Sequence, residues 1–297
     1  MTLRFPEICN VVGVDFSGGR NSGLTAWMAR AEVLGGRPGP GPGADRPRLR
    51  LRSLDPLSRL AGGEDRETVN RFFVDQIIAS DRAVWGFDFP FGLPIELALG
   101  PWTRQLKQLD RFAGDAKEYG RLLVARTQEV ADTMHIRRLT DRETKTPFDC
   151  YHYRIIYQTF HGMRDVLRRI VTDRDTCVLP FQLRRLADKG HSVRRLVVEA
   201  CPSSTLKRLG LPHRLYKQSG GKPPTESQRL VRKEILAGLT PRIELPPRTR
   251  REIMANPGGD ALDAIIAAVG CWEAMVTDDH LSVAKHPRYR LEGRVYA

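Results

Sequence analysis

Three apolar runs that lie far apart in the chain each end in a carboxylate, and this pattern constrains the fold most. The runs 11–14, 83–87 and 195–198 are followed by Asp15, Asp88 and Glu199. β-branched and aromatic residues favour strands, and short apolar runs bounded by turn signals are typical of strands covered on both faces. Because parallel strands end at the same edge of a sheet, we expect an α/β fold with clustered acids.

The segments between these runs complete the expected sheet. Residues 23–29 are strand-like, and residues 48–54 alternate polar and apolar side chains, as a half-buried antiparallel strand does. The proline- and glycine-rich stretch 35–43 is typical of a flexible surface loop. Residues 65–80 show helical spacing before the run at 83–87, which makes a crossover unit. We therefore predict a mixed sheet of five strands, three antiparallel and then parallel ones, flanked by helices.

The length of 297 residues fits one large domain with insertions or two small domains. We expect a single domain over 1–297. Its core covers 8–94 and 191–276, a large helical insertion covers 95–190, and a C-terminal tail covers 277–297.

Within the insertion, residues 151–161 interleave aromatic rings with arginine. Single-stranded nucleic acid is bound by such rings through stacking and by such charges. The alternative is an amphipathic helix, and its spacing favours a core position for Tyr153, Ile156, Tyr157 and Phe160. In that interpretation the arginines still face solvent or a ligand.

A run of small apolar residues near the C-terminal end carries two more acids, Asp260 and Asp263. Being three residues apart, they share one face at the start of a helix that spans 256–270. Asp260 could simply cap this helix and Asp263 favour its dipole. However, Asp263 lies inside an apolar run, where an unpaired carboxylate is costly. A metal ion, a lysine or a hydrogen-bond partner must therefore compensate it.

The charge balance favours a polyanionic partner. The chain has 48 Lys and Arg against 35 Asp and Glu, a net charge of +13, which is typical of a nucleic-acid binder but also of a merely soluble protein. Five widely spaced cysteines without a CxxC pair argue against a disulfide framework or a zinc ribbon. The first residues show no apolar core behind a basic region, as a secretory signal would, and no apolar run approaches the length of a membrane helix. We therefore expect a cytoplasmic protein without a secretory signal.

Acids at the centre of a basic protein have a physical rationale. Clustered carboxylates repel one another unless a cation neutralises them. Mg²⁺ prefers a few carboxylates, water and phosphate oxygens, and two such ions stabilise the attacking and leaving oxygens of phosphodiester cleavage. The acids would hold Mg²⁺ or Mn²⁺ while lysine and arginine hold the nucleic-acid backbone.

The order of these elements resembles the RNase H-like fold. The segments VGVDF, GFDFPFGLP, VVEACP and GGDALDA are similar to those of a family that is catalogued as a domain of unknown function and described as predicted RNase H-like nucleases. The closing DALDA is also similar to the last catalytic motif of Holliday-junction resolvases with this fold. The resemblance covers most of the chain and is weakest over 95–190.

The resemblance implies a role for each acid. Asp15 would be the central metal ligand, Asp88 the acid of the second motif, and Asp260 and Asp263 the closing catalytic pair. Asp15, Asp88, Asp263 and Glu199 would hold the metal, with Glu199 having the weakest counterpart in the family. Basic residues of the family suggest phosphate contacts by Lys217 and Arg229, to which we add Lys222 of the same loop.

Three functions are open at this point. The first is a Mg²⁺- or Mn²⁺-dependent nuclease with a two-metal mechanism. The second is a non-catalytic nucleic-acid-binding module of RNase H-like fold. The third is a phosphotransferase of the sugar-kinase and actin type, which shares the fold. The segment DFSGG, which begins at Asp15, resembles a phosphate-binding turn. Those proteins duplicate the domain, however, and the sequence has no second copy of the first-strand motif.

Overall fold

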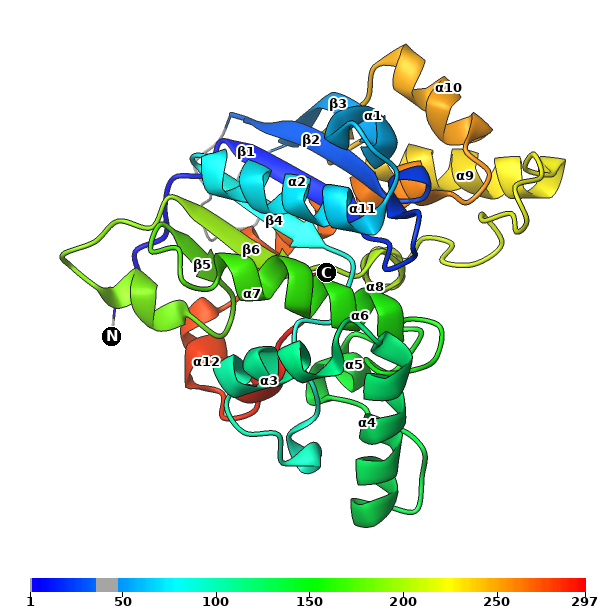
Figure 1. Ribbon diagram of the computed structural model, residues 1–297. Helices are drawn as coiled ribbons and strands as arrows, with labels where there is room; N and C mark the ends of the chain where they lie inside the picture. The colour runs from blue at the N-terminus through cyan, green and yellow to red at the C-terminus, as the bar shows by residue number, and fades with distance from the viewer. Residues whose placement is uncertain (1, 36–47) are drawn as a thin grey trace.

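A mixed β-sheet runs through the centre of the computed structural model, which describes residues 2–35 and 48–297 (Figure 1). The strands lie in the order β5 (Thr176–Val178), β6 (Arg195–Glu199), β4 (Ala83–Phe87), β1 (Asn10–Asp15), β2 (Trp27–Leu34), β3 (Arg48–Pro56) and β7 (Ile243–Glu244). Strands β1, β2 and β3 form an antiparallel meander, and β4, β6 and β5 continue from β1 as parallel strands. This order confirms the predicted antiparallel-then-parallel arrangement.

The predicted number of five strands is wrong, because the sheet has seven. The additional strands are β5, which lies within the segment 95–190, and β7, which pairs parallel with β3. They contain three and two residues, too few to show a period in the sequence. Strand β2 also begins later than the run from Gly23 suggested, since residues 22–24 form a short 3₁₀ turn. Most of the expected loop at 35–43 lies outside the described residues.

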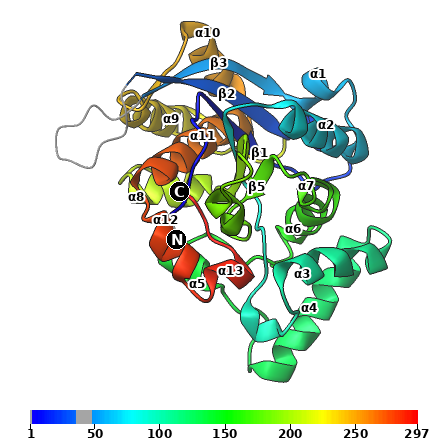
Figure 2. The same ribbon diagram turned by 90° about the vertical axis from the view of Figure 1, so that its left-hand side faces the viewer.

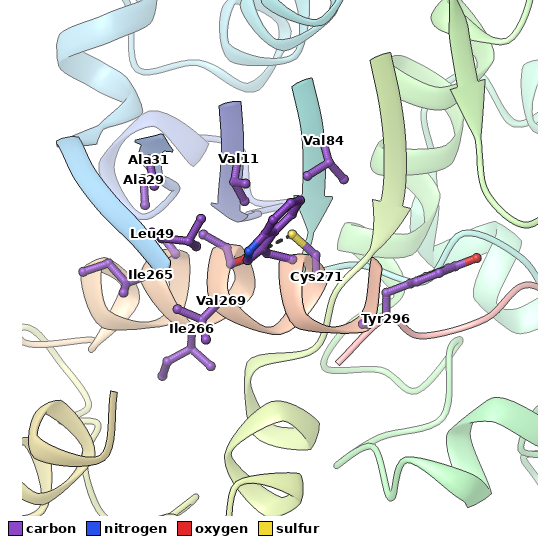
Figure 3. Close-up of a cluster of buried hydrophobic side chains, with 14 of the residues drawn as sticks. Val11, Ala29, Ala31, Leu49, Val84, Ile265, Ile266, Val269, Cys271 and Tyr296 are labelled. Carbon is purple, nitrogen blue, oxygen red and sulfur yellow. Dashed lines mark hydrogen bonds between the residues drawn. The ribbon is translucent and has the colours of Figure 1, made fainter. Parts of the chain in front are cut away.

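Helices cover both faces of the sheet (Figure 2). One face packs against α11 (Asp260–Thr277) and α8 (Pro202–Arg208), and the other against α2 (Arg66–Ala79) and the helical stretch that begins with α6 (Ile156–His161). Side chains alternate between the two cores. Val11 faces α11 (Figure 3), whereas Val12 and Val14 belong to the core on the side of α2. The core therefore lies on both sides of β1.

Helix α11 lies directly on the backbone of the two central strands. Gly13 of β1 pairs with Gly86 of β4, and a Cβ atom at Gly13 would lie 2.1 Å from the carbonyl oxygen of Ala264. Small residues on both surfaces thus permit the close approach that fixes the start of α11 next to the end of β1. This contact explains the small-residue composition of the helix.

The remaining helices are α1 (Leu57–Ala61), α3 (Trp102–Gln108), α4 (Ala116–Val130), α5 (Leu139–Glu143), α7 (Arg168–Ile170), α9 (Glu226–Leu239), α10 (Pro247–Ala255), α12 (His280–Lys285) and α13 (Tyr289–Glu292). Of these, α3, α4, α5 and α12 lie below the sheet in Figure 1, whereas α1 and α10 lie at its upper edge. Thr225 caps α9 as the sequence suggests. None of the helices in the described residues combines the length and the apolar character that a membrane crossing requires.

The predicted core position of the aromatic block is only half right. Ile156 and Phe160 are buried, but Tyr153 is 70% exposed and Tyr157 is 43% exposed. Helix α6 begins at Ile156, so Tyr153 lies in the preceding turn and does not share the buried face. Tyr157 lies on the outer side of the helix, one position after Ile156.

Candidate active site

The five acids singled out by the sequence line one cavity at the carboxyl ends of the parallel strands. The cavity has a volume of about 620 Å³. Asp15 ends β1, Asp88 follows β4 and Glu199 ends β6, and these three strands are neighbours in the sheet. Asp260 and Asp263 reach the same cavity from the first turn of α11. The expected convergence of distant acids is therefore present.

The two acids of α11 are positioned by a glycine turn. Gly259 precedes the helix with φ of +80°, a left-handed conformation that favours glycine. Gly259 itself, not Asp260, occupies the N-cap position. The amide of Ala261 instead donates to the side chain of Asn256 at 3.2 Å. The capping interpretation of Asp260 is therefore wrong, and its carboxylate lines the cavity next to Asn256.

Asp263 is neutralised by a lysine and a tyrosine. Its side chain is 1% exposed, and Oδ2 forms an ion pair with Nζ of Lys217. The hydroxyl of Tyr216 donates to Oδ1 at 2.7 Å. Burial alone would lower the pKa of Lys217, but the negative charge of Asp263 raises this pKa well above its ordinary value. Two of the three expected compensating groups are thus present, and Lys217 contacts an acid in this structure.

Asp15 and Asp88 have no such partner. Within residues 2–35 and 48–297, neither carboxylate forms a hydrogen bond or an ion pair of its own through its side chain. Burial, followed by the negative charge of Asp263, raises the pKa of Asp15 well above its ordinary value. The same two causes raise the pKa of Asp88 to about 7. A bound cation would therefore stabilise the charged form of both carboxylates.

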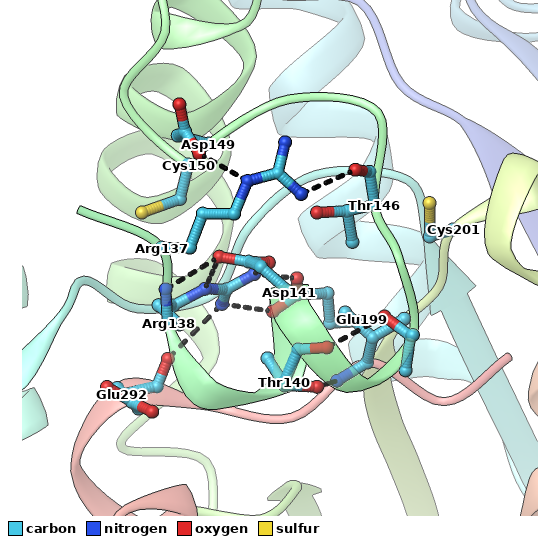
Figure 4. Close-up of polar contacts among 12 residues, drawn as sticks. Arg137, Arg138, Thr140, Asp141, Thr146, Asp149, Cys150, Glu199, Cys201 and Glu292 are labelled. Atoms are coloured by element: carbon cyan, nitrogen blue, oxygen red, sulfur yellow. Dashed lines mark hydrogen bonds and ion pairs between the residues drawn. The ribbon is translucent and has the colours of Figure 1, made fainter. Parts of the chain in front are cut away.

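Glu199 differs from the other acids, because a buried arginine binds both of its oxygens (Figure 4). Nη1 and Nη2 of Arg138 lie 2.8 and 2.5 Å from the two carboxylate oxygens, and the amide of Phe91 donates at 2.9 Å. Arg138 also contacts Asp141 at 2.8 Å. This geometry does not support the metal-ligand role predicted for Glu199. Glu199 instead lines the cavity as the partner of Arg138 and of the Phe91 amide.

Only one of the three basic residues predicted to contact phosphate lies at the cavity. Lys217 lines the cavity, whereas Lys222 and Arg229 are exposed and do not. The sequence interpretation missed Tyr216 and Arg138. It also missed the backbone strain at Leu215, which has a φ of +62° directly before Tyr216 and Lys217. The need of Asp263 for a partner was visible in the sequence, but nothing there identified Lys217 or Tyr216 as that partner.

The donor set matches a divalent cation in chemical type. Asp15, Asp88, Asp260 and Asp263 supply hard carboxylate oxygens in one cavity, and such oxygens are preferred by Mg²⁺ and Mn²⁺. In the part of the chain that the structure describes, no three acidic, histidine or cysteine side chains are close enough to hold one metal ion as they stand. The cation next to these acids is the ammonium group of Lys217. Metal binding by Asp263 would require this group to leave its Oδ2 atom.

Replacing Asp88 by asparagine is expected to stabilise the metal-free protein at high pH. Because its folded pKa of about 7 lies above the unfolded value, Asp88 binds its proton more tightly in the folded state. Its stabilising contribution is complete at acidic pH and is lost as the pH rises through about 7. The gain of Asp88→Asn over wild type should be small at about pH 4 and about 2–4 kcal/mol at about pH 8. Urea unfolding at both pH values measures it, and an equal difference at both would contradict the buried, repelled carboxylate.

Comparison with known proteins identifies one matching family model. It covers residues 13–288 and is described as a protein of unknown function (DUF429). No curated protein and no solved structure matches the chain.

Proposed function

The chain belongs to the DUF429 family, and we propose that this member is a Mg²⁺- or Mn²⁺-dependent nuclease that cleaves phosphodiester bonds. One observation carries the proposal: Asp15 and Asp88 face a shared cavity without a cation of their own, next to Asp263, whose cation is a lysine. Buried acids that repel one another reduce stability, and such groups cluster at functional sites. The net charge of +13 supports a polyanionic substrate.

The order of elements supports an RNase H-like fold for this enzyme. Three antiparallel strands, a helix, two parallel strands and a closing helix follow one another as β1, β2, β3, α2, β4, β6 and α11. The acid at the end of the central strand and the acidic pair on the closing helix occupy the positions that such a fold uses for catalysis. The edge strands β5 and β7 extend this arrangement without changing it.

The residues that would hold the metal are Asp15, Asp88 and Asp263, with Asp260 beside them. A bound Mg²⁺ or Mn²⁺ would lower the pKa of a water molecule and neutralise charge on the phosphate. The side chains of the protein bind and orient the substrate. Lys217, once released from Asp263, supplies an ammonium group for a phosphate oxygen, and the hydroxyl of Tyr216 keeps Asp263 aimed at the cavity. Arg214 adds a second positive charge at the cavity wall.

A cleavage assay tests this function. Labelled single-stranded DNA, single-stranded RNA, duplexes and hybrids are incubated with the protein and Mn²⁺ or Mg²⁺. We expect cleavage of at least one of them, loss of cleavage on chelation, and recovery when the metal is restored. The function is wrong if no substrate is cut with either metal, or if cleavage persists under chelation.

A non-catalytic nucleic-acid-binding module is the second candidate, because Asp263 is already neutralised by Lys217 without a metal ion. This alternative predicts salt-sensitive binding that Asp15→Asn leaves intact. It also predicts no heat of Mn²⁺ binding in titration calorimetry, whereas the nuclease predicts a metal-binding heat that Asp15→Asn reduces.

A further inference from the structure

We infer that the mouth of the acid cavity binds unpaired nucleobases, so that the substrate is single-stranded nucleic acid. This inference rests on the proposed function and gives its substrate class. The surface consists of Phe148, His152, Tyr153 and Arg154, which we term the aromatic rim. Phe148 lines the cavity that contains the acids, and the other rim residues join this cavity through their contacts with Phe148 and with one another.

The rim is a stack of rings and a guanidinium group at the surface. The rings of Phe148 and His152 lie 4.9 Å apart at an angle of 22°, and those of His152 and Tyr153 lie 4.4 Å apart. The guanidinium carbon of Arg154 is 5.5 Å from the centre of the Phe148 ring and 5.7 Å from that of Tyr153. Although it belongs to this stack, Tyr153 remains 70% exposed. The rings are thus held in place by one another and keep surface for a ligand.

The charge of Arg154 is also available. Throughout the described ranges 2–35 and 48–297, no carboxylate forms an ion pair with Arg154, whose Nε donates to the hydroxyl of Tyr153 at 3.1 Å. The neighbouring acid Asp149 is paired with Arg137 at 2.9 Å. Exposed rings next to unpaired arginine bind single strands, because a free base stacks on the rings and the backbone meets the positive charge.

A basic segment borders the same cavity. Arg214 is exposed and has no ion-pair partner in the described part of the chain, and the side chain of Lys217 is half exposed. Both residues line the cavity together with Phe148. Bases on the rim and phosphates at Arg214 and Lys217 would hold one strand across the acids.

The size of the cavity agrees with this substrate. Its volume of about 620 Å³ falls in the range of pockets that enclose a drug-sized molecule. A single nucleotide unit is of that size, whereas a base pair within a duplex is not free to enter.

Binding without cleavage tests the inference. Fluorescence anisotropy with a short labelled oligonucleotide, single-stranded or in a duplex, is measured under chelation so that no bond is cut. We expect the single strand to bind at least about tenfold more tightly than the duplex. Tyr153→Ala and Phe148→Ala should each weaken single-strand binding about five- to a hundredfold, and Tyr153→Phe should retain it.

Tyr157→Ala is the matched control, because Tyr157 is also an exposed tyrosine but its ring stacks on His161 and contacts none of the rim residues. It should bind like wild type. Equal affinity for single strand and duplex, or wild-type affinity of both rim variants, would overturn the inference. Single-strand binding that depends on the rim, without cleavage of any substrate, would refute the nuclease but not the rim. Cleavage of duplexes at the wild-type rate by Tyr153→Ala and Phe148→Ala would refute the rim but not the nuclease.

Discussion

Asp15→Asn is expected to reduce metal-dependent cleavage by at least about a thousandfold, equivalent to about 4 kcal/mol of transition-state stabilisation. Asp15 lies at the end of the central strand, and the charges of Asp88, Asp260 and Asp263 all act on it. Asparagine has nearly the same shape but lacks the negative charge with which a carboxylate binds and neutralises the metal ion. Initial cleavage rates at saturating Mn²⁺ measure the effect.

The fold should survive this substitution. Because burial raises the pKa of Asp15, the loss of its charge at neutral pH should leave stability unchanged or increased, which urea unfolding checks. Asp81→Asn is the matched control, since Asp81 is exposed just before β4, at the opposite end of that strand from Asp88. Its cleavage rate should equal that of wild type. A wild-type rate for Asp15→Asn would show that the acid cavity is not the active site.

Arg138→Met is expected to lower the free energy of unfolding by about 3–5 kcal/mol. Arg138 is 1% exposed and neutralises two buried acids, Asp141 and Glu199. Its removal leaves both carboxylates without a counter-charge, which costs far more than the lost packing. Since the free energy of unfolding of a whole domain is only about 5–15 kcal/mol, this single substitution would remove a large part of it. Urea unfolding at neutral pH provides the measurement.

The neighbouring Arg137→Met provides the control for charge and chain length. Arg137 pairs with Asp149 at 2.9 Å, but its side chain is 39% exposed, so its loss should cost less than about 1 kcal/mol. Adding Glu199→Gln to Arg138→Met should recover part of the lost stability. Equal effects of the two arginine variants would mean that Glu199 is not held by a buried ion pair and is available as a metal ligand.

The convergence of the acids could be predicted from the sequence because it follows from strand direction. Asp15 and Asp88 each follow a buried run, and parallel neighbours end at one edge. Asp263 could be added because a buried carboxylate requires compensation. These inferences need only local pattern and general topology.

The partners of these acids could not be predicted in the same way. Lys217 meets Asp263, and Arg138 meets Glu199, through loops and short helices whose paths depend on tertiary packing. The positive φ of Leu215 could not be predicted from its residue type, since leucine normally avoids this conformation. The exposure of Tyr153 depends on where α6 begins, and helix ends are the least predictable part of a helix.

The most direct test of the metal site is the anomalous scattering of Mn²⁺ in crystals of the protein. The proposed nuclease predicts a manganese peak bounded by the carboxylates of Asp15, Asp88 and Asp263, with the ammonium group of Lys217 displaced from Asp263. No manganese in the acid cavity at saturating concentration, with Lys217 still paired with Asp263, would contradict it.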